Sequence, residues 1–568
     1  MRFDNWDIGS FDRDTAVEFC RNGVNPLVSV FLASRGITDL KDVSAAIGNE
    51  QTGLFDPLLM ADMDKAVVRI NKAVSNGERI AVYGDYDVDG MTSCAILSIW
   101  LDSKNADFEI YIPERFNEGY GLNNSALSNL KEKGITLVIT VDCGITAIEE
   151  AEFAKSIGLD LVITDHHECR GDLPDAVAVV DPKRPDCKYP YKSLAGVGVA
   201  FKLICALEND YQSDTIIKSY CDLVALGTVA DVMPVVGENR ELIKLGLDIL
   251  NRYPRPGFRS LLQEIGITPG TVTSSTIGFT LAPRLNAAGR MGQSELSVKL
   301  LLSKSYEDSE ELAVELCRLN SERRSLEQEI YDEAIAMLSG EAVPCEPIVL
   351  AQKGWYQGVT GIIAAKIAER YCVPAVIISI DEDGTGRGSC RSFGSFVLYD
   401  ALCSCEDILL NYGGHEMAAG VTVAEENIDE LRTRIVKYYN DNVTAITKPG
   451  LKLDFEVEKP ELLTIQNIEA LEHLEPFGNG NPSPCLCILG AVLSSAQSIG
   501  DGKHSKLKIG KSGKNLDCIF FSVPTEDLGV SEGMTVDLAF EPQVNEFRGR
   551  SNVQLQLHDI RASKEQTI

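Results

Sequence analysis

The fold is decided by residues 79–90, which read RIAVYGDYDVDG. The apolar run at 80–83 predicts a short buried strand, and the carboxylates of Asp85, Asp87 and Asp89 follow it at alternate positions. Residues 91–100 then read as a helix. Three carboxylates packed into a strand–helix turn repel one another unless a cation neutralises them. Clusters of oxygen ligands favour magnesium or manganese, so the stretch predicts a site for one of these ions.

Three further acidic elements resemble the first. Residues 136–141 form a continuous apolar and β-branched run that ends at Asp142. Residues 161–164 form another, which ends in Asp165-His166-His167-Glu168, and the run 225–230 ends at Asp231. Continuous runs of this kind are typical of parallel strands buried on both faces. We therefore expect each of these polar groups to follow a strand.

The order of the predicted elements indicates an α/β domain with an open parallel sheet. Strands alternate with helices, as in βαβ units. Ligands of such sheets bind outside the carboxyl ends of the strands, so one edge can gather all the candidate ligands. Imidazole beside carboxylates shifts the expected metal toward manganese, with magnesium as the alternative.

Taken singly, each element has a structural explanation. An Asp-x-Asp pair is more often a turn or a helix cap, and adjacent histidines are usually a surface pair. Asp142 could simply end a strand, and Asp231 could cap a helix. Four such elements in step with predicted strand ends favour one shared site.

These residues resemble the DHH phosphoesterase superfamily, which is named for the triplet matched here by residues 165–167. Within it the chain is most similar to the RecJ family of bacterial single-strand-specific exonucleases, over nearly its whole length. The resemblance implies two metal ions, Mn²⁺ or Mg²⁺, bridged by Asp142, and a histidine, His167, that faces the scissile phosphate. The metal ligands it implies are Asp87, Asp89, Asp142, His166 and Asp231, and the catalytic residues are Asp89, Asp142 and His167.

One position departs from some of the relatives. They place a histidine four residues before the first ligand aspartate, where this chain has Tyr83, a poor ligand at neutral pH. We expect Asp85 or water to compensate as a ligand of that ion.

The resemblance also implies a substrate site in the middle of the chain. Its residues are Arg115, Arg290, Ser389, Arg391 and His415, and Ser389 and Arg391 are expected to seat the 5′ phosphate. The stretch Gly386–Ser392 offers N–H groups, hydroxyls and guanidinium groups for an anion. Without the resemblance, a Gly-rich turn there, a helix-entry turn at 413–415 and structural ion pairs of Arg115 and Arg290 are the simpler interpretations. A histidine of the relatives is replaced here by Tyr356, so its role is not carried over.

We expect five parts in the chain. They are an N-terminal extension (1–55), the DHH catalytic domain (56–235), a helical connector (236–340), a second α/β domain of the DHHA1 type (341–445) and an OB-like β-barrel (446–568). Residues 312–338 predict a long amphipathic helix that links the two α/β domains. Alternating stretches at 451–458, 506–509 and 553–557 predict the strands of the barrel. By the resemblance the barrel binds nucleic acid, with Phe477, Lys503, His504, Lys506, Phe547, Arg548 and Arg550 as candidate contacts.

The composition limits the compartment and the partners. The chain has 568 residues, 44% of them hydrophobic, and no stretch long enough to span a bilayer. The N-terminal MRFDNWD lacks a signal-peptide segment, and none of the 16 cysteines forms a Cys-x-x-Cys pair, so we expect a cytoplasmic protein with free thiols. The net charge of −31 opposes non-specific DNA binding, and predicts strong salt sensitivity and a partner that helps recruitment.

The resulting hypothesis is a 5′→3′ exonuclease of single-stranded DNA that releases 5′-mononucleotides in DNA repair and recombination. Direction, strand choice and DNA preference rest on the resemblance. The expected partners are single-stranded DNA, a single-strand-binding protein and a helicase, with no membrane and a monomeric state. Two alternatives are a DHH phosphatase or hydrolase of small oligonucleotides, and a DNA-binding scaffold without catalysis.

Overall fold

The computed structural model describes residues 3, 5–47, 53–113, 121–169, 171–338, 345–443, 450–547 and 549–563, without the side chain of Phe547. The chain divides into two compact units. The central unit contains 52–446 and 478–481, and the terminal unit contains 1–51, 447–477 and 482–568. Among the described residues, no helix has the length and apolar character that a membrane crossing requires.

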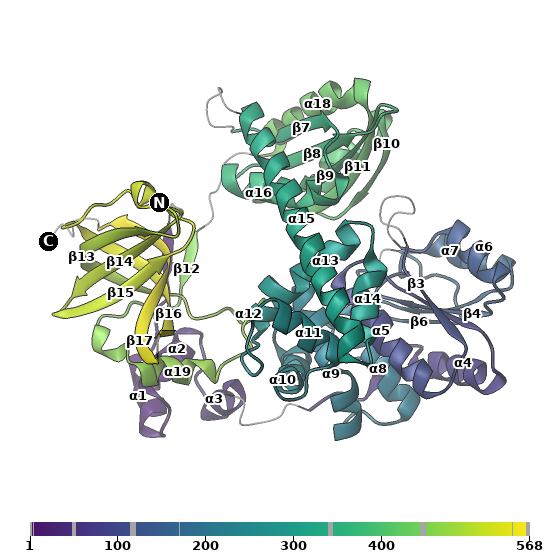
Figure 1. The fold of residues 1–568 in the computed structure, drawn as a ribbon, viewed down its shortest axis with the longest axis horizontal. Helices are drawn as coiled ribbons and strands as arrows, with labels where there is room; N and C mark the ends of the chain where they lie inside the picture. The colour runs from purple at the N-terminus through teal and green to yellow at the C-terminus, as the bar shows by residue number, and fades with distance from the viewer. Residues whose placement is uncertain are drawn as a thin grey trace. The chain divides into compact units, whose positions relative to one another are not determined.

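A five-stranded sheet forms the first half of the central unit (Figure 1). The strand order is β3-β2-β4-β5-β6, and every neighbouring pair is parallel. Tyr83 pairs with Thr140 and Val141 pairs with Thr164, so the carboxyl ends of the three central strands lie at one edge. The strands are β2 (Ile80–Tyr83), β3 (Phe108–Tyr111), β4 (Leu137–Val141), β5 (Asp160–Thr164) and β6 (Ala178–Val180). The predicted parallel sheet is confirmed.

Helices cover both faces of this sheet because its strands are apolar on both sides. Ile80 and Val82 pack into one core, together with α4 (Met63–Asn76), α5 (Val88–Ser103), α8 (Gly196–Glu208) and α9 (Asp214–Ala230). Ala81 and Tyr83 face the opposite core, with α6 (Asn124–Glu132) and α7 (Ile148–Ser156). Alternate residues of one strand thus serve two cores.

A helical segment follows the sheet. It contains α10 (Gly237–Arg252), α11 (Pro256–Glu264), α12 (Ser274–Thr276), the π-helical turn η2 (Ile277–Leu281), α13 (Ala282–Arg290), α14 (Ser294–Leu302) and α15 (Tyr306–Leu338). The predicted linking helix is confirmed as α15, which begins at Tyr306, before the predicted start at 312.

A second sheet completes the central unit, with the order β10-β11-β9-β8-β7 (Figure 1). β7 and β8 are parallel and the other pairs are antiparallel. The helix α16 (Gln357–Tyr371) packs in one core, and α17 (Leu398–Cys403) and α18 (Ile428–Asn442) pack in the other. The strands are β7 (Ile348–Lys353), β8 (Ala375–Ile380), β9 (Thr385–Arg391), β10 (Leu409–Gly414) and β11 (Ala418–Ala424).

Two glycine-rich stretches of this sheet differ from the simpler interpretations of the sequence. The stretch 386–392 is mainly a strand and not a turn. A Cβ at Gly386 or Gly388 would lie 2.9 or 2.8 Å from the side chains of β8 and β11, so glycine fits the close packing there. Residues 413–415 are the end of β10 and the turn after it, and not a helix entry.

A closed five-stranded barrel dominates the terminal unit, with the order β13-β14-β15-β17-β16, which confirms the expected β-barrel. Its strands are β13 (Leu486–Ile499), β14 (His504–Lys511), β15 (Lys514–Phe520), β16 (Thr535–Phe547) and β17 (Arg550–Ala562). The helix α19 (Ile465–Glu472) precedes it. The strand expected over 451–458 is wrong in extent, because β12 covers only Leu451–Leu453 and the chain then contacts β13 through a single bridge at Glu456.

The N-terminal residues pack inside the terminal unit. The strand β1 (Trp6–Ile8) pairs in parallel with β12, and Trp6 Nε1 donates to Asp559 Oδ2 at 3.0 Å. Phe19 and Phe31 share one apolar core with the barrel. They lie on α1 (Arg13–Arg21) and α2 (Pro26–Ser34), which α3 (Leu40–Ala46) follows. The segment predicted as an extension is thus a structural part of the unit that contains the barrel.

Candidate metal centre

Side chains from four elements meet at the carboxyl edge of the first sheet. The β2–α5 loop and the start of α5 contribute Asp85, Asp87 and Asp89, β4 is followed by Asp142, and β5 is followed by His166 and His167. Asp231 follows a helix, α9, so the prediction that it ends a strand is wrong. The run 225–230 is apolar because that end of α9 is largely buried, and a short apolar run does not distinguish a strand from a buried helix.

The candidate ligand atoms form three overlapping groups. Within each group all ligand atoms lie within 4.8 Å of one another. The groups are Asp85–Asp87–Asp142, Asp89–His166–Asp231 and Asp142–His166–His167. Asp142 and His166 each belong to two groups, and Asp142 Oδ1 lies 3.1 Å from His166 Nε2, so the arrangement offers two adjacent cation positions with the Asp142 carboxylate beside both.

The ring of His166 is the meeting point of the second group. Its Nε2 lies 3.1 Å from Asp142 Oδ1, 3.6 Å from Asp231 Oδ2 and 3.8 Å from Asp89 Oδ2. Burial, followed by the charge of neighbouring His167, lowers the pKa of His166 to about 3. The ring is therefore neutral at physiological pH, which is the form that binds a metal.

The N-terminus of α8 holds Asp89 in place. Gly196 N donates to Asp89 Oδ2 at 2.7 Å, and Val197 N donates to Asp89 Oδ1 at 2.8 Å. These bonds satisfy two N–H groups that have no partner within the helix. A Cβ at Gly196 would lie 2.6 Å from Asp142 Cβ, so only glycine lets the helix approach both carboxylates.

Asp142 adopts the left-handed backbone conformation, with φ 62°. This conformation costs a non-glycine residue on the order of 1–3 kcal/mol and is typical of functional sites. It turns the chain sharply after β4, and the following Gly144 also has a positive φ, of 111°.

Several carboxylates are buried together at this centre. In the absence of a cation they repel one another, so their pKa values rise and they bind protons more readily. Burial, followed by the charges of Asp231 and Asp87, raises the pKa of Asp89 well above its ordinary value. Burial and the carboxylates around it raise the pKa of Asp142 in the same way. Burial and the charge of Asp87 raise the pKa of Asp231 to about 7. A divalent cation removes this repulsion, and the oxygen-rich donor set with one imidazole fits Mn²⁺ or Mg²⁺.

His167 has a different environment from His166. Burial alone would lower its pKa, but the hydrogen bond with Asp165 and the charges of Asp165, Asp231 and Asp89 raise the pKa of His167 to about 9. Asp165 Oδ1 lies 2.7 Å from His167 Nδ1 and also accepts the backbone N–H of His167. His167 is therefore a protonated, oriented group beside the ligands.

Arg290, Ser389 and Arg391 gather at the N-terminus of α16. Ser389 Oγ lies 2.9 Å from Thr360 Oγ1, and a Cβ at Gly361 would lie 3.5 Å from both Ser389 Oγ and Arg391 Nη2. Arg290 Nη1 donates to Gly358 O at 3.3 Å. A helix N-terminus with two guanidinium groups and a hydroxyl is suited to an anionic phosphate.

Comparison with known proteins shows to which family the chain belongs. Residues 79–228 match the DHH family N-terminal domain, 346–441 match the DHHA1 domain, and 453–559 match the RecJ OB domain. The single-stranded-DNA-specific exonuclease RecJ of Bacillus subtilis (strain 168) is 39% identical over 563 residues, covering 98% of this chain and 71% of the relative. The chain belongs to the RecJ family. The protein of the same name from Escherichia coli (strain K12) is 33% identical, with 94% of this chain and 96% of the relative covered.

Solved structures of RecJ agree with this assignment. The crystal structure of RecJ in complex with Mn²⁺ from Thermus thermophilus matches with a TM-score of 0.83 at 29% identity. The match covers 99% of this chain and 80% of that chain. The Mg²⁺ complex from the same organism matches with a TM-score of 0.78 at 28% identity, with 99% of this chain and 79% of that chain covered.

Two tyrosines, Tyr83 and Tyr356, stand where the resemblance led us to expect histidines. Tyr83 points away from the ligands, because its hydroxyl donates to Gly121 O at 2.9 Å and its ring stacks on Tyr111. Asp85 is a member of the first ligand group, and its part as a ligand stays a prediction. Tyr356 donates to Arg290 O at 3.0 Å, so it supports Arg290.

The other predicted nucleic-acid contacts are divided between the two compact units. His415 lies in the β10–β11 turn and donates its N–H to the oxygen of Ala418, which pairs with Arg391, so it lies at the same end of the sheet as Arg391. Phe477 packs half-buried against the core of the terminal unit. Lys503, Lys506 and Arg550 are exposed, and His504 accepts a hydrogen bond from Ser522 N. Arg115, Arg548 and the side chain of Phe547 lie outside the described residues.

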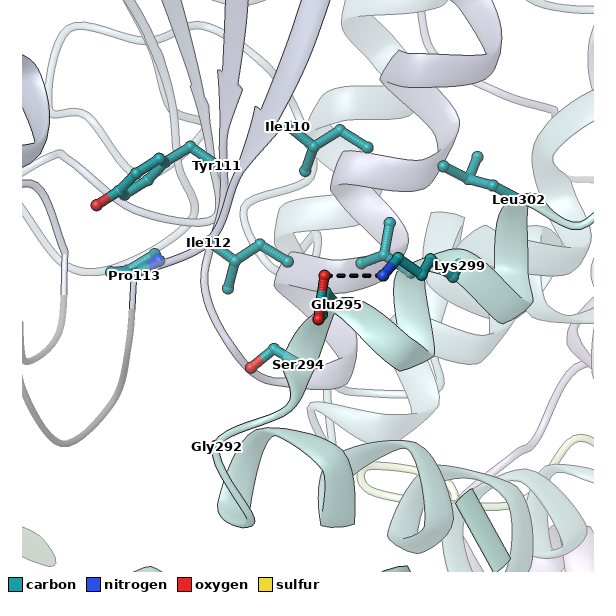
Figure 2. A pocket seen from close by; sticks show the side chains of 10 residues that line it. Ile110, Tyr111, Ile112, Pro113, Gly292, Ser294, Glu295, Lys299 and Leu302 are labelled. Atoms are coloured by element: carbon teal, nitrogen blue, oxygen red, sulfur yellow. Dashed lines mark hydrogen bonds and ion pairs between the residues drawn. The ribbon is translucent and has the colours of Figure 1, made fainter. Parts of the chain in front are cut away.

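A cavity of about 450 Å³ lies beside the edge strand β3, and none of the predicted ligands lines it (Figure 2). Ile110 and Ile112 point toward it and Tyr111 points away, as alternation along a strand requires. Glu295 and Lys299 form an ion pair at 2.9 Å in its wall. The candidate metal centre therefore lies outside this cavity, at the carboxyl edge of the first sheet.

Sequence reasoning missed two supporting residues. Asp165 was recognised as part of the triplet, but its function of orienting His167 was not predicted. Gly196 was not considered, although two glycines that open an apolar run at 196–198 are a signal of close backbone approach.

Proposed function

We propose that the chain is a metal-dependent exonuclease that hydrolyses single-stranded DNA from the 5′ end and releases 5′-mononucleotides. The observation that carries the proposal is the set of three overlapping ligand groups, in which Asp142 and His166 each belong to two. Its relatives are named single-stranded-DNA-specific exonucleases, and its solved relatives hold Mn²⁺ or Mg²⁺. We propose the same substrate and either ion here.

The ligands would be divided between two ions. Asp85, Asp87 and Asp142 would hold one, and Asp89, His166 and Asp231 would hold the other. Asp142 Oδ1 lies 3.1 Å from His166 Nε2, so the Asp142 carboxylate would also reach the second ion. When bound, such a pair lowers the pKa of a water molecule and offsets charge on the phosphate.

The chain's own groups would position the DNA. His167, protonated and held by Asp165, would donate a hydrogen bond to a phosphate oxygen. Arg290, Ser389 and Arg391 would bind the terminal 5′ phosphate at the start of α16. The distance between this phosphate group and the metal centre would then set which bond is cut.

The barrel is proposed to bind single-stranded DNA. A net charge of −31 leaves little non-specific attraction for DNA, so recruitment by a single-strand-binding protein or a helicase is part of the proposal. We further propose that the enzyme acts as a monomer.

A labelled-substrate assay tests the activity. Single- and double-stranded oligonucleotides, labelled at either end, are incubated with Mn²⁺, Mg²⁺ or EDTA. We expect mononucleotides from single strands only, with the 5′ label released first and no product in EDTA. Early release of the 3′ label, or equal digestion of duplex, would contradict the proposal. Products confined to the shortest oligonucleotides would favour the small-substrate alternative.

A variant pair tests the 5′-phosphate site. Arg391→Ala should remove the preference for a 5′-phosphorylated strand over a 5′-hydroxyl strand. Arg387→Ala is the matched control, because Arg387 lies on the same strand and pairs with Asp381 at 3.3 Å. An unchanged preference in Arg391→Ala would exclude this residue from the phosphate site.

A further inference from the structure

The turn after α9 carries the candidate ligand Asp231, and the residue after it, Val232, has a strained backbone conformation. Val232 N donates to Val229 O at 3.1 Å and Met233 N donates to Thr228 O at 3.2 Å, which is the Schellman arrangement of a helix end. Glycine usually occupies the left-handed position of this motif, but here it is Val232, with φ 56°. A β-branched residue is unfavourable there, so contacts from outside must hold the turn.

A distant segment provides such contacts. Residues 478–481 belong to the central unit although their neighbours in sequence do not. Asn479 Nδ2 donates to Val232 O at 2.9 Å, and Asn479 O accepts from Val235 N at 2.6 Å. Asn479 thus binds both sides of the turn that begins at Asp231.

Residues 478–481 form a tight loop that brings Asn479 close to the turn after α9. Gly478 and Asn481 exchange two backbone hydrogen bonds, of 2.8 and 3.1 Å, which close a tight loop around Asn479. A Cβ at Gly478 would lie 2.6 Å from Val235 Cγ2, so the loop approaches the turn as closely as glycine allows.

Other partners hold the far side of the turn. Pro234 O accepts hydrogen bonds from Asn239 Nδ2 at 3.1 Å and from Tyr191 at 3.3 Å. The carbonyl of Val232, the residue that follows Asp231, is bound by Asn479. Asp231 N donates to Gly227 O at 2.9 Å on the helix side, and Asn479 binds the carbonyl of the next residue, so Asn479 holds the chain directly after the Asp231 carboxylate.

We propose that Asn479 is a positioning residue of the metal centre, which acts by holding the strained Val232 turn so that Asp231 can coordinate a divalent cation. The inference rests on the metal site of the proposed function. It assigns to the C-terminal part of the sequence a contribution to metal binding that is separate from DNA binding.

Metal titration of the full-length protein tests the inference. Mn²⁺ affinity is measured by calorimetry without DNA for wild type, Asn479→Ala and Asn440→Ala. Asn440 is the matched control, because its side chain also makes one exposed hydrogen bond, to Glu346 at 3.1 Å. We expect the dissociation constant to rise about fivefold in Asn479→Ala, the worth of one hydrogen bond, and to stay unchanged in the control.

Two further readouts separate positioning from general stability. At saturating Mn²⁺ the turnover of Asn479→Ala on single-stranded DNA should approach that of wild type, because every ligand is retained. The double variant Asn479→Ala/Val232→Gly should recover most of the metal affinity, since glycine removes the strain that Asn479 offsets.

Three results would overturn the inference. They are wild-type affinity in Asn479→Ala, an equal loss in Asn440→Ala, and a double variant that binds no better than Asn479→Ala. Wild-type Mn²⁺ binding without nuclease activity would instead refute the proposed function, because binding is measured without DNA.

Discussion

At the scale of single residues, Asp89 is both a hydrogen-bond acceptor that fixes the start of a helix and a candidate metal ligand. Its carboxylate accepts two N–H groups of α8 and belongs to a ligand group with His166 and Asp231. In Asp89→Asn we expect activity to fall by more than about 100-fold, because even a supporting contact of a metal ligand is worth about 10–100-fold. The thermal midpoint should stay within about 4 °C of wild type, since the neutral amide relieves repulsion while losing one of the two hydrogen bonds to α8.

Asp248→Asn is the control for this change, because Asp248 is an exposed acid paired with Arg252 at 2.8 Å. Hydrolysis and circular dichroism melting of both variants are compared in Mn²⁺. Turnover near the wild-type value in Asp89→Asn would remove this residue from the centre.

The raised pKa values of Asp89, Asp142 and Asp231 predict a pH dependence of metal binding. An acid whose pKa is higher in the folded state stabilises the metal-free fold at low pH, and this contribution is lost as pH rises through the folded pKa. For Asp231 that pKa is about 7. Mn²⁺ displaces the protons and removes the repulsion, so the increase in melting temperature that Mn²⁺ causes should be larger at about pH 8 than at about pH 6.

Differential scanning fluorimetry with and without Mn²⁺ measures this difference. Asp231→Asn should reduce it, because one titrating ligand is lost. A shift that is equal at both pH values would show that these carboxyl groups do not compete with protons for the ion.

At the scale of elements, the sequence predicted strands where local pattern and burial agree. β2, β4 and β5 are apolar on both faces, and each is followed by polar ligands, so the edge of the sheet could be located from the sequence. The run 225–230 predicts a strand before Asp231 because the buried end of α9 has the same apolar composition as the strands. β9 was not recognised, because its glycines lie in a strand for a packing reason that only the neighbouring strands reveal.

The start of α8 gives a prediction at this scale. Gly196→Ala would place a Cβ 2.6 Å from Asp142 Cβ, so the helix or the carboxylate must move. We expect Mn²⁺ affinity to fall about tenfold or more, as for other contacts that orient metal ligands. Titration with Mn²⁺ measures the loss.

Gly278→Ala is the matched control for Gly196→Ala. A Cβ at Gly278 would make only an ordinary contact, 3.6 Å from Val229 Cγ1. Its Mn²⁺ affinity should equal that of wild type. Equal affinities of both variants would mean that the start of α8 does not support the centre.

At the scale of the whole molecule, the pairing of the two ends of the chain could not be predicted from local patterns. Trp6 and Asp559 are 553 positions apart, and β1 pairs with β12 from the other end of the sequence. Short strands and helices at the N-terminus carry no signal of their partner, because apolar faces of similar composition are interchangeable until the fold is known. The N-terminal residues were therefore separated from the barrel in the predicted domain order.

This pairing changes what a C-terminal deletion should do. Removal of 446–568 takes away the partners of Phe19, Leu27 and Phe31, which are at most 1% exposed, so we expect the truncated chain to aggregate. A second variant that contains only 52–445 lacks both parts of the terminal unit and should remain soluble. Size-exclusion chromatography compares the two, and a soluble single deletion would contradict the shared core.

Both variants also lack Asn479. The variant that contains only 52–445 should therefore bind Mn²⁺ more weakly than the full chain, although it keeps every candidate ligand.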